Sequence, residues 1–379
     1  MSVVLPCLNE ADSVAAVVRE AVDALDSAGV PGEVIVVDNG STDGSAIAAA
    51  EAGARLVAER RRGYGQAYLA GFAAARGRYV VMADADGSYD LRAIPKLLEA
   101  LEDGHDLVMG SRFRGHIEPG AMPWLHRYVG SPALSGLLNL FYGTGVGDAH
   151  CGIRAFRRDA LPLLRLRMPG MEFASEMIVN GARAGLRIGE IPVDYRVRVG
   201  RSKLNTMRDG WRHLRFLLLY SPTHLFFIPG AALFGVGFAL LLLLLPGPAT
   251  ILGFYLGIHY MVLGAGFALL GAQIVTLGLY AKTIAVALGL QQVDRTLAAF
   301  RRVFSLERGL LVGAILFASG FGVDAEIAIG WAASGFGALN DVHPALFALA
   351  AMVLGLQLAF SSLFLSLIDL QVGRAAAPQ

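Results

Sequence analysis

The first half of the chain alternates short, valine-rich apolar runs with amphipathic stretches. Five such runs predict buried strands, at residues 2–6, 33–38, 54–59, 78–84 and 106–111. Between the runs, the apolar positions of residues 12–25 and 93–102 recur at helical spacing. Strands that alternate with helices predict a doubly wound α/β sheet, of the Rossmann-like kind.

Polar clusters follow three of these strands. They read PCLNE (6–10), DNGSTDG (38–44) and DADGSYD (84–90). In doubly wound sheets, ligands bind beyond the carboxyl ends of the strands. The sequence therefore predicts a binding site at this edge of the sheet.

The pattern changes after residue 202. In residues 203–220, Leu204, Met207, Trp211 and other apolar residues recur at helical spacing and are flanked by Lys and Arg. This basic amphipathic pattern predicts a helix in a membrane interface. The alternative is a helix that packs on the preceding domain.

Four long apolar segments follow, and each has the ~20 residues that cross a bilayer. The predicted spans are residues 224–245, 251–280, 309–331 and 345–368. In the third span, Asp324 and Glu326 are expected near the outer end. The predicted organisation is a soluble domain over 1–202, an interfacial helix over 203–222 and an all-α membrane domain over 223–379.

Composition and charge agree with this division. Of the 379 residues, 55% are hydrophobic and 17% are charged, and only twelve of the charged residues lie after residue 222. A charged fraction well below about 25% argues against an ordinary soluble enzyme and against disorder. A net charge of +1 gives no field that would favour nucleic acid. The two cysteines, Cys7 and Cys151, show neither a disulfide nor a zinc pattern, and we expect buried thiols.

The loops predict the orientation. The connection 282–308 holds Lys282 and four arginines, whereas the loops near 246–250 and 332–344 hold no Lys or Arg. By the positive-inside rule the basic loop is cytoplasmic, and four spans then place both termini on that side. The N-terminal residues lack the pattern of a signal peptide, so we expect the soluble domain in the cytoplasm.

Asp84 and Asp86 are the strongest candidates for chemistry. Two carboxylates one residue apart at a strand end can face a divalent cation and a diphosphate together, because Mg²⁺ and Mn²⁺ prefer hard oxygen ligands. Such a metal neutralises a departing diphosphate. The alternative is a polar loop that caps the next helix.

The motifs together are specific. PCLNE (6–10), VVDNGSTDG (36–44), GYGQAYLAG (63–71), ADADGSYD (83–90) and GSRF (110–113) resemble glycosyltransferase family 2, which has the nucleotide-sugar-binding GT-A fold. DAHCGIRAF (148–156) and YRVRVGRSKL (195–204) resemble its dolichol-phosphate mannose synthase and polyprenyl-phosphate glycosyltransferase group. The resemblance covers residues 2–215, and four membrane helices behind the catalytic domain also occur in that group.

The resemblance implies a role for individual residues. Asp84, Asp86 and Ser88 match the metal positions, and Arg127 and Ser202 match the acceptor phosphate site. The implied catalytic residues are Asp86, Asp148, Arg112 and Arg127. The implied donor site is Pro6, Leu8, Glu10, Val37, Asn39, Asp84, Ala85, Asp86, Arg112, Arg198 and Lys203.

Two positions depart from the family pattern. Asn39 stands where the family commonly has Asp, at a position expected to touch the base or ribose. An amide donates as well as accepts, so the identity of the nucleobase does not carry over. Ser88 is shorter than the Gln often found there, which leaves room for a water in the metal shell.

Other residues keep two interpretations. Asp148 is a candidate general base, or it holds one of the arginines. A phosphate monoester has its second pKa near ~6, so a lipid phosphate attacks without giving up a proton. Gly63 and Gly65 flank either a phosphate-binding turn or a tight helix start. Glu172 and Glu176 share a helix face and are either structural or orient an arginine.

The implied function is inverting transfer of a single sugar, such as mannose or glucose, from a nucleotide diphosphate sugar to a polyprenyl phosphate at the cytoplasmic membrane face. The enzyme would use Mg²⁺ or Mn²⁺ and would have no nucleic acid partner. A homo-oligomer of this chain is a further candidate partner. A processive polysaccharide synthase is an alternative, but the QxxRW motif of that group is missing. A transporter or flippase with a regulatory nucleotide-binding domain would need charge at mid-membrane depth, which these spans nearly lack. A catalytically dead scaffold is disfavoured by the intact Asp84 and Asp86.

Cysteine labelling tests the orientation. A membrane-impermeant thiol reagent added to intact cells should react with a cysteine placed at position 340, because the loop there has no basic residue. The same reagent should not react at positions 300 and 376, which we place in the cytoplasm. Labelling at position 300 would reverse the predicted orientation.

Overall fold

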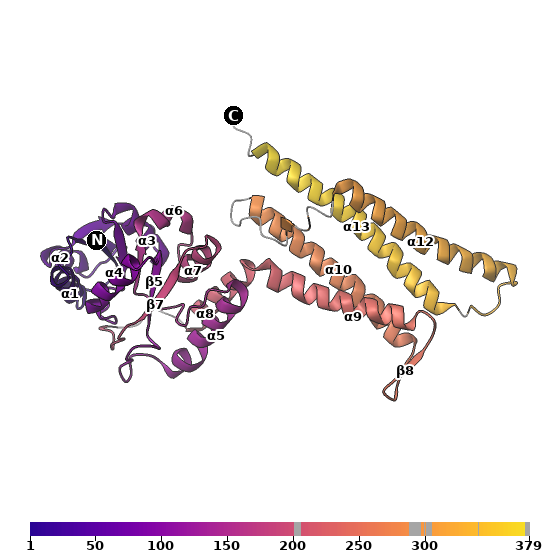
Figure 1. The fold of residues 1–379 in the computed structure, drawn as a ribbon, viewed down its shortest axis with the longest axis horizontal. Helices are drawn as coiled ribbons and strands as arrows, with labels where there is room; N and C mark the ends of the chain where they lie inside the picture. The colour runs from indigo at the N-terminus through magenta and orange to yellow at the C-terminus, as the bar shows by residue number, and fades with distance from the viewer. Residues whose placement is uncertain (201–205, 288–296, 299, 301–304, 340, 376–379) are drawn as a thin grey trace. The chain divides into compact units, whose positions relative to one another are not determined.

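The computed structural model describes residues 1–379 except 201–205, 288–296, 299, 301–304, 340 and 376–379. The chain divides into two units, Met1–Leu217 and Leu218–Gln379. The first unit is an α/β domain and the second is helical (Figure 1). Both the doubly wound sheet and the helical C-terminal region are as predicted.

The first unit is built on a seven-stranded mixed sheet in the order β3-β2-β1-β4-β6-β5-β7. β1 pairs in parallel with β2 and β4, whereas β6 runs antiparallel to both β4 and β5. The strands are β1 (Ser2–Cys7), β2 (Glu33–Asp38), β3 (Arg55–Ala58), β4 (Tyr79–Met82), β5 (Leu107–Ser111), β6 (Arg154–Arg157) and β7 (Ile188–Pro192).

Helices connect these strands and cover both faces of the sheet. They are α1 (Val14–Ser27), α2 (Ser45–Glu51), α3 (Tyr64–Ala74), α4 (Ile94–Glu102), α5 (Ser131–Tyr142), α6 (Leu161–Leu164), α7 (Phe173–Arg183) and α8 (Thr206–Leu219). Short 3₁₀ turns span Leu91–Ala93 and Arg158–Ala160, and a π-helical turn spans His126–Gly130.

Successive side chains of the strands point to opposite faces of the sheet, and apolar side chains pack on each face. Val3 and Leu5 of β1 face a cluster that includes apolar residues of α1 and α4. On the other face, Phe72 of α3 packs edge-on against Phe156, and the ring of Tyr68 stacks on that of Phe173 in α7. All of these side chains are buried. The carboxyl ends of β1, β2 and β4 are thereby held in fixed positions.

Two strands were not predicted from the sequence. β6 has the residues RAFR and β7 has IGEIP, so neither shows a long valine run. Both are held by their neighbours in the sheet: β6 lies between β4 and β5, and β7 pairs with β5. Tertiary pairing, more than intrinsic propensity, creates them.

The predicted 203–222 helix is α8 in the part that the structure describes. Its buried residues are His213, Phe216 and Leu217, and the hydroxyl of Tyr142 donates to the carbonyl of Leu217. Trp211, from the predicted apolar stripe, is 58% exposed. The helix face that packs on the rest of the first unit therefore carries His213, Phe216 and Leu217, and Trp211 of the predicted stripe lies on a different face. Leu204 lies outside the described residues.

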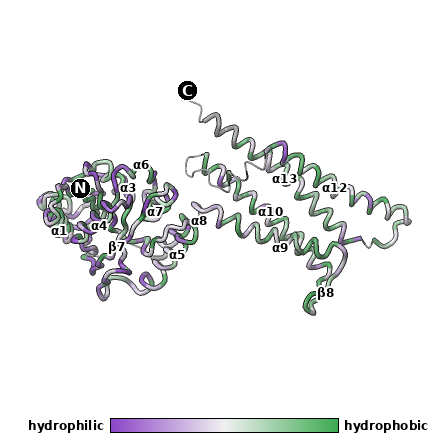
Figure 2. The backbone as a smooth tube through the Cα atoms, in the orientation of Figure 1, coloured by the Kyte–Doolittle hydropathy of each residue, from purple (hydrophilic) through white to green (hydrophobic). Residues whose placement is uncertain are grey.

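Among its described residues, the second unit contains four helices that are long and apolar enough to cross a membrane. Figure 2 shows hydrophobic residues along most of their length. They are α9 (Ile228–Leu244, preceded by a π-helical turn over Thr223–Phe227), α10 (Ile258–Ala287), α12 (Leu306–Ala333) and α13 (Val342–Ala375). Each of the four predicted segments overlaps one of these helices, and the helix ends differ from the predicted bounds.

The second span begins later than the predicted residue 251. Residues Ala249–Ile251 and Phe254–Leu256 form the antiparallel strands β8 and β9 of a hairpin. Leu252 and Gly253 turn the chain with φ of 49° and 82°. A turn of this kind excludes a continuous helix, and α10 starts at Ile258.

Glycines allow close packing of α9 and α10. A Cβ added at Gly237 would lie 2.3 Å from the backbone nitrogen of Ala268, and one at Gly271 would lie 2.3 Å from that of Phe234. Small residues at such positions let helix backbones approach in a membrane, where the hydrophobic effect does not drive helix association.

Candidate active site

A cavity of about 320 Å³ lies where β1, β2 and β4 end. The polar clusters of the sequence predict a site at this edge of the sheet. The lining residues are Pro6, Cys7, Leu8, Glu10, Asn39, Arg62, Gly63, Tyr64, Ala67, Asp84, Ala85, Asp86, Gly170, Met171, Arg198 and Arg212. They come from seven separate stretches of the sequence.

Two hydroxyl groups fix the backbone around the aspartates. Tyr68 of α3 donates to the carbonyl of Ala83 at 3.0 Å, and Ser13, just before α1, donates to that of Ala85 at 2.8 Å. Because both hydroxyls come from helices packed on the sheet, the loop after β4 is held from both faces. Its two carboxylates therefore project from a rigid support.

Asp84 is in a poorly solvated position. The hydroxyl of Tyr64 donates to its Oδ1 at 3.1 Å. Burial, and then the charge of Asp86, raise the pKa of Asp84 to about 7. A Cβ on Gly152 would lie 2.6 Å from Asp84 Oδ2, so only glycine leaves space beside that oxygen.

Asp86 is buried and has two partners. Its Oδ1 accepts from the backbone N–H of Ser88 at 3.0 Å. Its Oδ2 lies 3.0 Å from Nη2 of Arg198, which is also 3.8 Å from Glu10 Oε1. The predicted metal ligand thus forms an ion pair with the predicted donor-binding arginine.

These residues fit a divalent cation that also binds a diphosphate. In the part of the chain that the structure describes, no three His, Cys, Asp or Glu residues form a metal cage. Two carboxylates with hard oxygens, one of them with a raised pKa, suit Mg²⁺ or Mn²⁺, which often take their remaining ligands from water and substrate phosphates.

Arg112 and Asp148 form a buried pair. The guanidinium donates to both oxygens of Asp148, at 2.8 Å from Nε and 2.7 Å from Nη2, and the backbone N–H of Arg112 adds a third bond at 3.0 Å. Asp148 is completely buried. Of the two interpretations of Asp148, this geometry favours the one in which it holds an arginine.

Asn39 uses its side chain to join two loops. Its Nδ2 donates to the carbonyls of Glu59 and Arg61, both at 2.9 Å, and its Oδ1 accepts from the N–H of Gly63 at 2.8 Å. The amide therefore ties the end of β2 to the turn before α3. An aspartate could not donate these two bonds, which gives the departure from the family pattern a structural reason.

Glu176 holds a loop that leads to the cavity. Its carboxylate accepts the backbone N–H groups of Arg167 and Met168, at 3.0 Å and 2.9 Å from Oε2. The loop that it holds continues to Gly170 and Met171, which line the cavity. The structural interpretation of Glu176 is the one that these contacts favour.

The structure brings much of the predicted donor site together. Pro6, Leu8, Glu10, Asn39, Asp84, Ala85, Asp86 and Arg198 all line the cavity. Val37, Ser88, Arg112, Arg127 and Asp148 are not among the lining residues. Val37 is buried within β2, and Arg127 lies in the turn before α5, over the ring of Tyr128. Ser202 and Lys203 lie outside the described residues.

Sequence reasoning assigned no specific role to several lining residues. Tyr64 is the most informative, because its hydroxyl contacts Asp84. The motif GYGQAYLAG predicts a role for the backbone of this turn, and only the fold shows that the Tyr64 side chain reaches the carboxylate. Met171 and Arg212 belong to segments without a nucleotide-binding motif. The cysteines, as expected, are buried free thiols.

The chain matches two family descriptions. Residues 2–164 match "Glycosyl transferase family 2", and residues 279–369 match "Glycosyltransferase family 2 C-terminal transmembrane region". The chain is 40% identical over 366 residues to the low-salt glycan biosynthesis hexosyltransferase Agl6 of Haloferax volcanii, with 96% of this chain and 88% of that protein covered. The chain therefore belongs to glycosyltransferase family 2 and, with its four apolar helices, is a membrane protein.

Other relatives match little more than half of the chain. A dolichyl-phosphate hexose transferase of Haloferax volcanii is 32% identical over 210 residues, covering 55% of this chain and 89% of that protein. Among solved structures, glucosyl-3-phosphoglycerate synthase of Mycobacterium tuberculosis, in complex with Mn²⁺, UDP-glucose and phosphoglyceric acid, is 26% identical. That match has a TM-score of 0.46 and covers 57% of this chain and 78% of the other.

The raised pKa of Asp84 predicts a pH effect on metal-free protein. The pKa of Asp84 is about 7 in the folded state and about 3.9 in the unfolded state. Between these pH values only the folded state keeps the proton, so the free energy of unfolding falls as pH rises from about 4 to about 7. The unfolding temperature of Asp84→Asn, which has no such group, should therefore rise relative to wild type between pH 5 and pH 7.5. Thermal unfolding in EDTA measures this difference. A difference that stays constant with pH would contradict the raised pKa.

Proposed function

We propose that this protein transfers a single hexose, with inversion, from a nucleotide diphosphate sugar to a polyprenyl phosphate at the cytoplasmic face of the membrane. The observation that carries the proposal is the pair Asp84 and Asp86 in a cavity with Arg198, on a chain with four membrane-length helices. Two relatives, named a hexosyltransferase and a dolichyl-phosphate hexose transferase, support the sugar and acceptor classes.

In this proposal the donor binds in the cavity. Asp84 and Asp86 hold Mg²⁺ or Mn²⁺, which when bound offsets the charge of the departing diphosphate. Pro6, in β1, and Leu8, just after it, line the cavity and are proposed to contact the nucleoside, whereas Arg198 is proposed to contact a phosphate. The nucleobase and the hexose are left open.

The acceptor phosphate attacks the anomeric carbon. A bond forms between a phosphate oxygen and that carbon, and the bond from the carbon to the donor diphosphate breaks, its electron pair leaving with the diphosphate. Because the second pKa of a phosphate monoester is near ~6, the nucleophile is already largely dianionic. Asp148 then needs no role as a base, and we assign it to orienting Arg112. Placement of the two reactants supplies most of the catalysis.

The acceptor site is proposed around Arg127, with Ser202 as a second contact. Several apolar side chains near Arg127 are exposed, among them Trp124 at 69% and Tyr128 at 67%. The exposed Trp211 of α8 adds to this character. Such side chains suit the interface between lipid and water, where a polyprenyl phosphate presents its headgroup.

A transfer assay tests the proposed function. Purified protein should move label from one of a panel of UDP- and GDP-hexoses onto polyprenyl phosphate. EDTA should abolish transfer and excess Mn²⁺ should restore it, because the diphosphate leaves only with its charge offset. Asp86→Ala should stay inactive at every metal concentration. Full transfer in EDTA would contradict the metal role, and no labelled lipid with any donor would contradict the function.

Two arginines separate the acceptor role from the donor role. Arg127→Ala should reduce transfer at least tenfold yet leave donor binding by calorimetry nearly unchanged, because it removes a charge-assisted contact to the acceptor only. Arg198→Ala should weaken donor binding itself. Equal losses of donor affinity in the two variants would show that Arg127 does not serve the acceptor.

A further inference from the structure

The segment 194–199 runs along the loop that carries the aspartates. The backbone N–H of Arg196 donates to the carbonyl of Ser88 at 2.8 Å, and that of Val199 donates to the carbonyl of Asp86 at 3.0 Å. Tyr195 forms isolated bridges with Tyr89 and Ile117. The side chains of Arg196 and Arg198 both contact carboxylates from other segments of the same unit.

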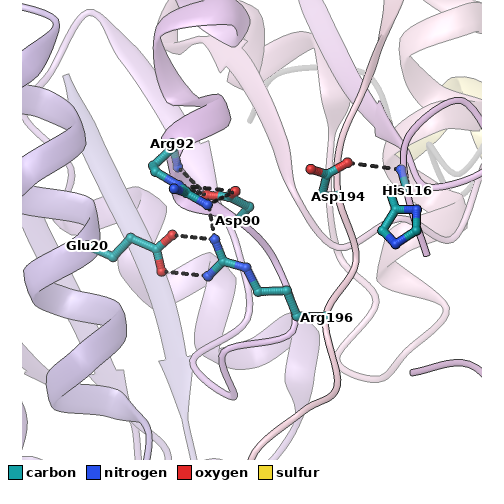
Figure 3. A network of polar contacts seen from close by, with 6 residues as sticks. All are labelled: Glu20, Asp90, Arg92, His116, Asp194 and Arg196. Atoms are coloured by element: carbon teal, nitrogen blue, oxygen red, sulfur yellow. Dashed lines mark hydrogen bonds and ion pairs between the residues drawn. The ribbon is translucent and has the colours of Figure 1, made fainter. Parts of the chain in front are cut away.

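Arg196 is anchored to structure outside the cavity. Its guanidinium donates to both oxygens of Glu20 in α1, each at 3.1 Å, and lies 2.8 Å from Asp90 Oδ1. Arg92 binds the same Asp90 (Figure 3). Bidentate arginine pairs fix geometry as well as charge. Arg196 thus ties the segment to a helix of the core.

Further contacts hold the segment at its start. Asp194 accepts from the backbone N–H of His116 at 2.9 Å (Figure 3), and the N–H of Val197 donates to Glu118 at 3.0 Å. The segment is therefore fixed on both sides of Arg196. Two residues further on, it presents Arg198 at the cavity.

Among the described residues, the ion-pair partners of Arg198 are both carboxylates. Nη2 lies 3.0 Å from Asp86 and 3.8 Å from Glu10. Its Nε is buried and has no hydrogen-bond partner among the described residues. A buried donor without a partner costs free energy. A further acceptor, such as a phosphate oxygen, would therefore stabilise Arg198 by accepting from its Nε.

We propose that Arg198 is an exchangeable counter-cation of the metal site, and that Arg196 is the positioning residue that holds it there. A divalent ion and a guanidinium cannot share Asp86 Oδ2 without strong repulsion. Metal binding then requires Arg198 to leave Asp86, and the donor diphosphate offers it a new partner. This inference rests on the proposed function only in taking Asp86 as a metal ligand.

Mn²⁺ binding without nucleotide tests the exchange. Full-length protein in detergent is titrated with Mn²⁺ and followed by calorimetry or by the electron paramagnetic resonance of free Mn²⁺. A neighbouring arginine typically lowers a carboxylate's affinity for a proton by a factor of about ten or more, and we expect a comparable effect on a metal cation. Arg198→Gln should accordingly bind Mn²⁺ about tenfold more tightly than wild type, and Arg198→Lys should return most of the way to the wild-type affinity.

A double-mutant cycle tests the anchor. Arg196→Gln alone should tighten Mn²⁺ binding by roughly threefold, and should add nothing in the Arg198→Gln background, because it acts only through Arg198. Arg92→Gln is the matched control: it removes the same charge from the same Asp90 but leaves the Glu20–Arg196 bonds. Its affinity for Mn²⁺ should equal that of wild type.

The outcomes are distinct. Unchanged Mn²⁺ affinity in Arg198→Gln would overturn the exchange, whatever the transfer assay shows. If the effects of Arg196→Gln and Arg198→Gln on Mn²⁺ affinity simply add, Arg196 does not act through Arg198 and its positioning role is overturned. An equal effect of Arg92→Gln would also overturn that role, because it would show that any lost positive charge near Asp90 changes Mn²⁺ affinity. Wild-type protein that binds no Mn²⁺ yet transfers sugar in EDTA would contradict the metal in the proposed function as well.

Discussion

Two carboxylates one residue apart, at the end of a buried strand, need a cation beside them. Burial and mutual repulsion already raise the pKa of Asp84 to about 7, and Asp86 is paired with Arg198. The arrangement of charges around the cavity follows from this constraint. The site therefore gathers negative charge at one edge of the sheet, with Arg198 as its countercharge.

The other charged groups near the site support this edge. Asp148 fixes Arg112, and Glu20 with Asp90 fixes Arg196, each through two or more short contacts. Arg198 is held differently, by Asp86 at 3.0 Å and by Glu10 at 3.8 Å. Breaking the buried Arg112–Asp148 pair would leave an uncompensated charge, so this pair resists rearrangement. Arg198 is the arginine whose partners a metal would take.

The sequence predicts the parts that local patterns encode. Valine-rich runs locate β1, β2 and β4, and apolar length locates the four membrane helices. β6 and β7 were missed because neighbouring strands create them. Tyr64, Asn39 and Arg196 each contact residues more than fifteen positions away, so their partners depend on the fold and not on any spacing that a motif could show. The same holds for the choice between a base and an arginine holder at Asp148.

The most direct measurement is a structure of the full chain with Mn²⁺ and a nucleotide diphosphate. We predict Mn²⁺ within coordination distance of Asp86 and of the diphosphate oxygens. The Arg198 guanidinium should have moved from Asp86 onto a phosphate, while the Arg196–Glu20 pair is unchanged. A nucleotide bound with Arg198 still on Asp86, and with no metal between the carboxylates and the diphosphate, would contradict this prediction.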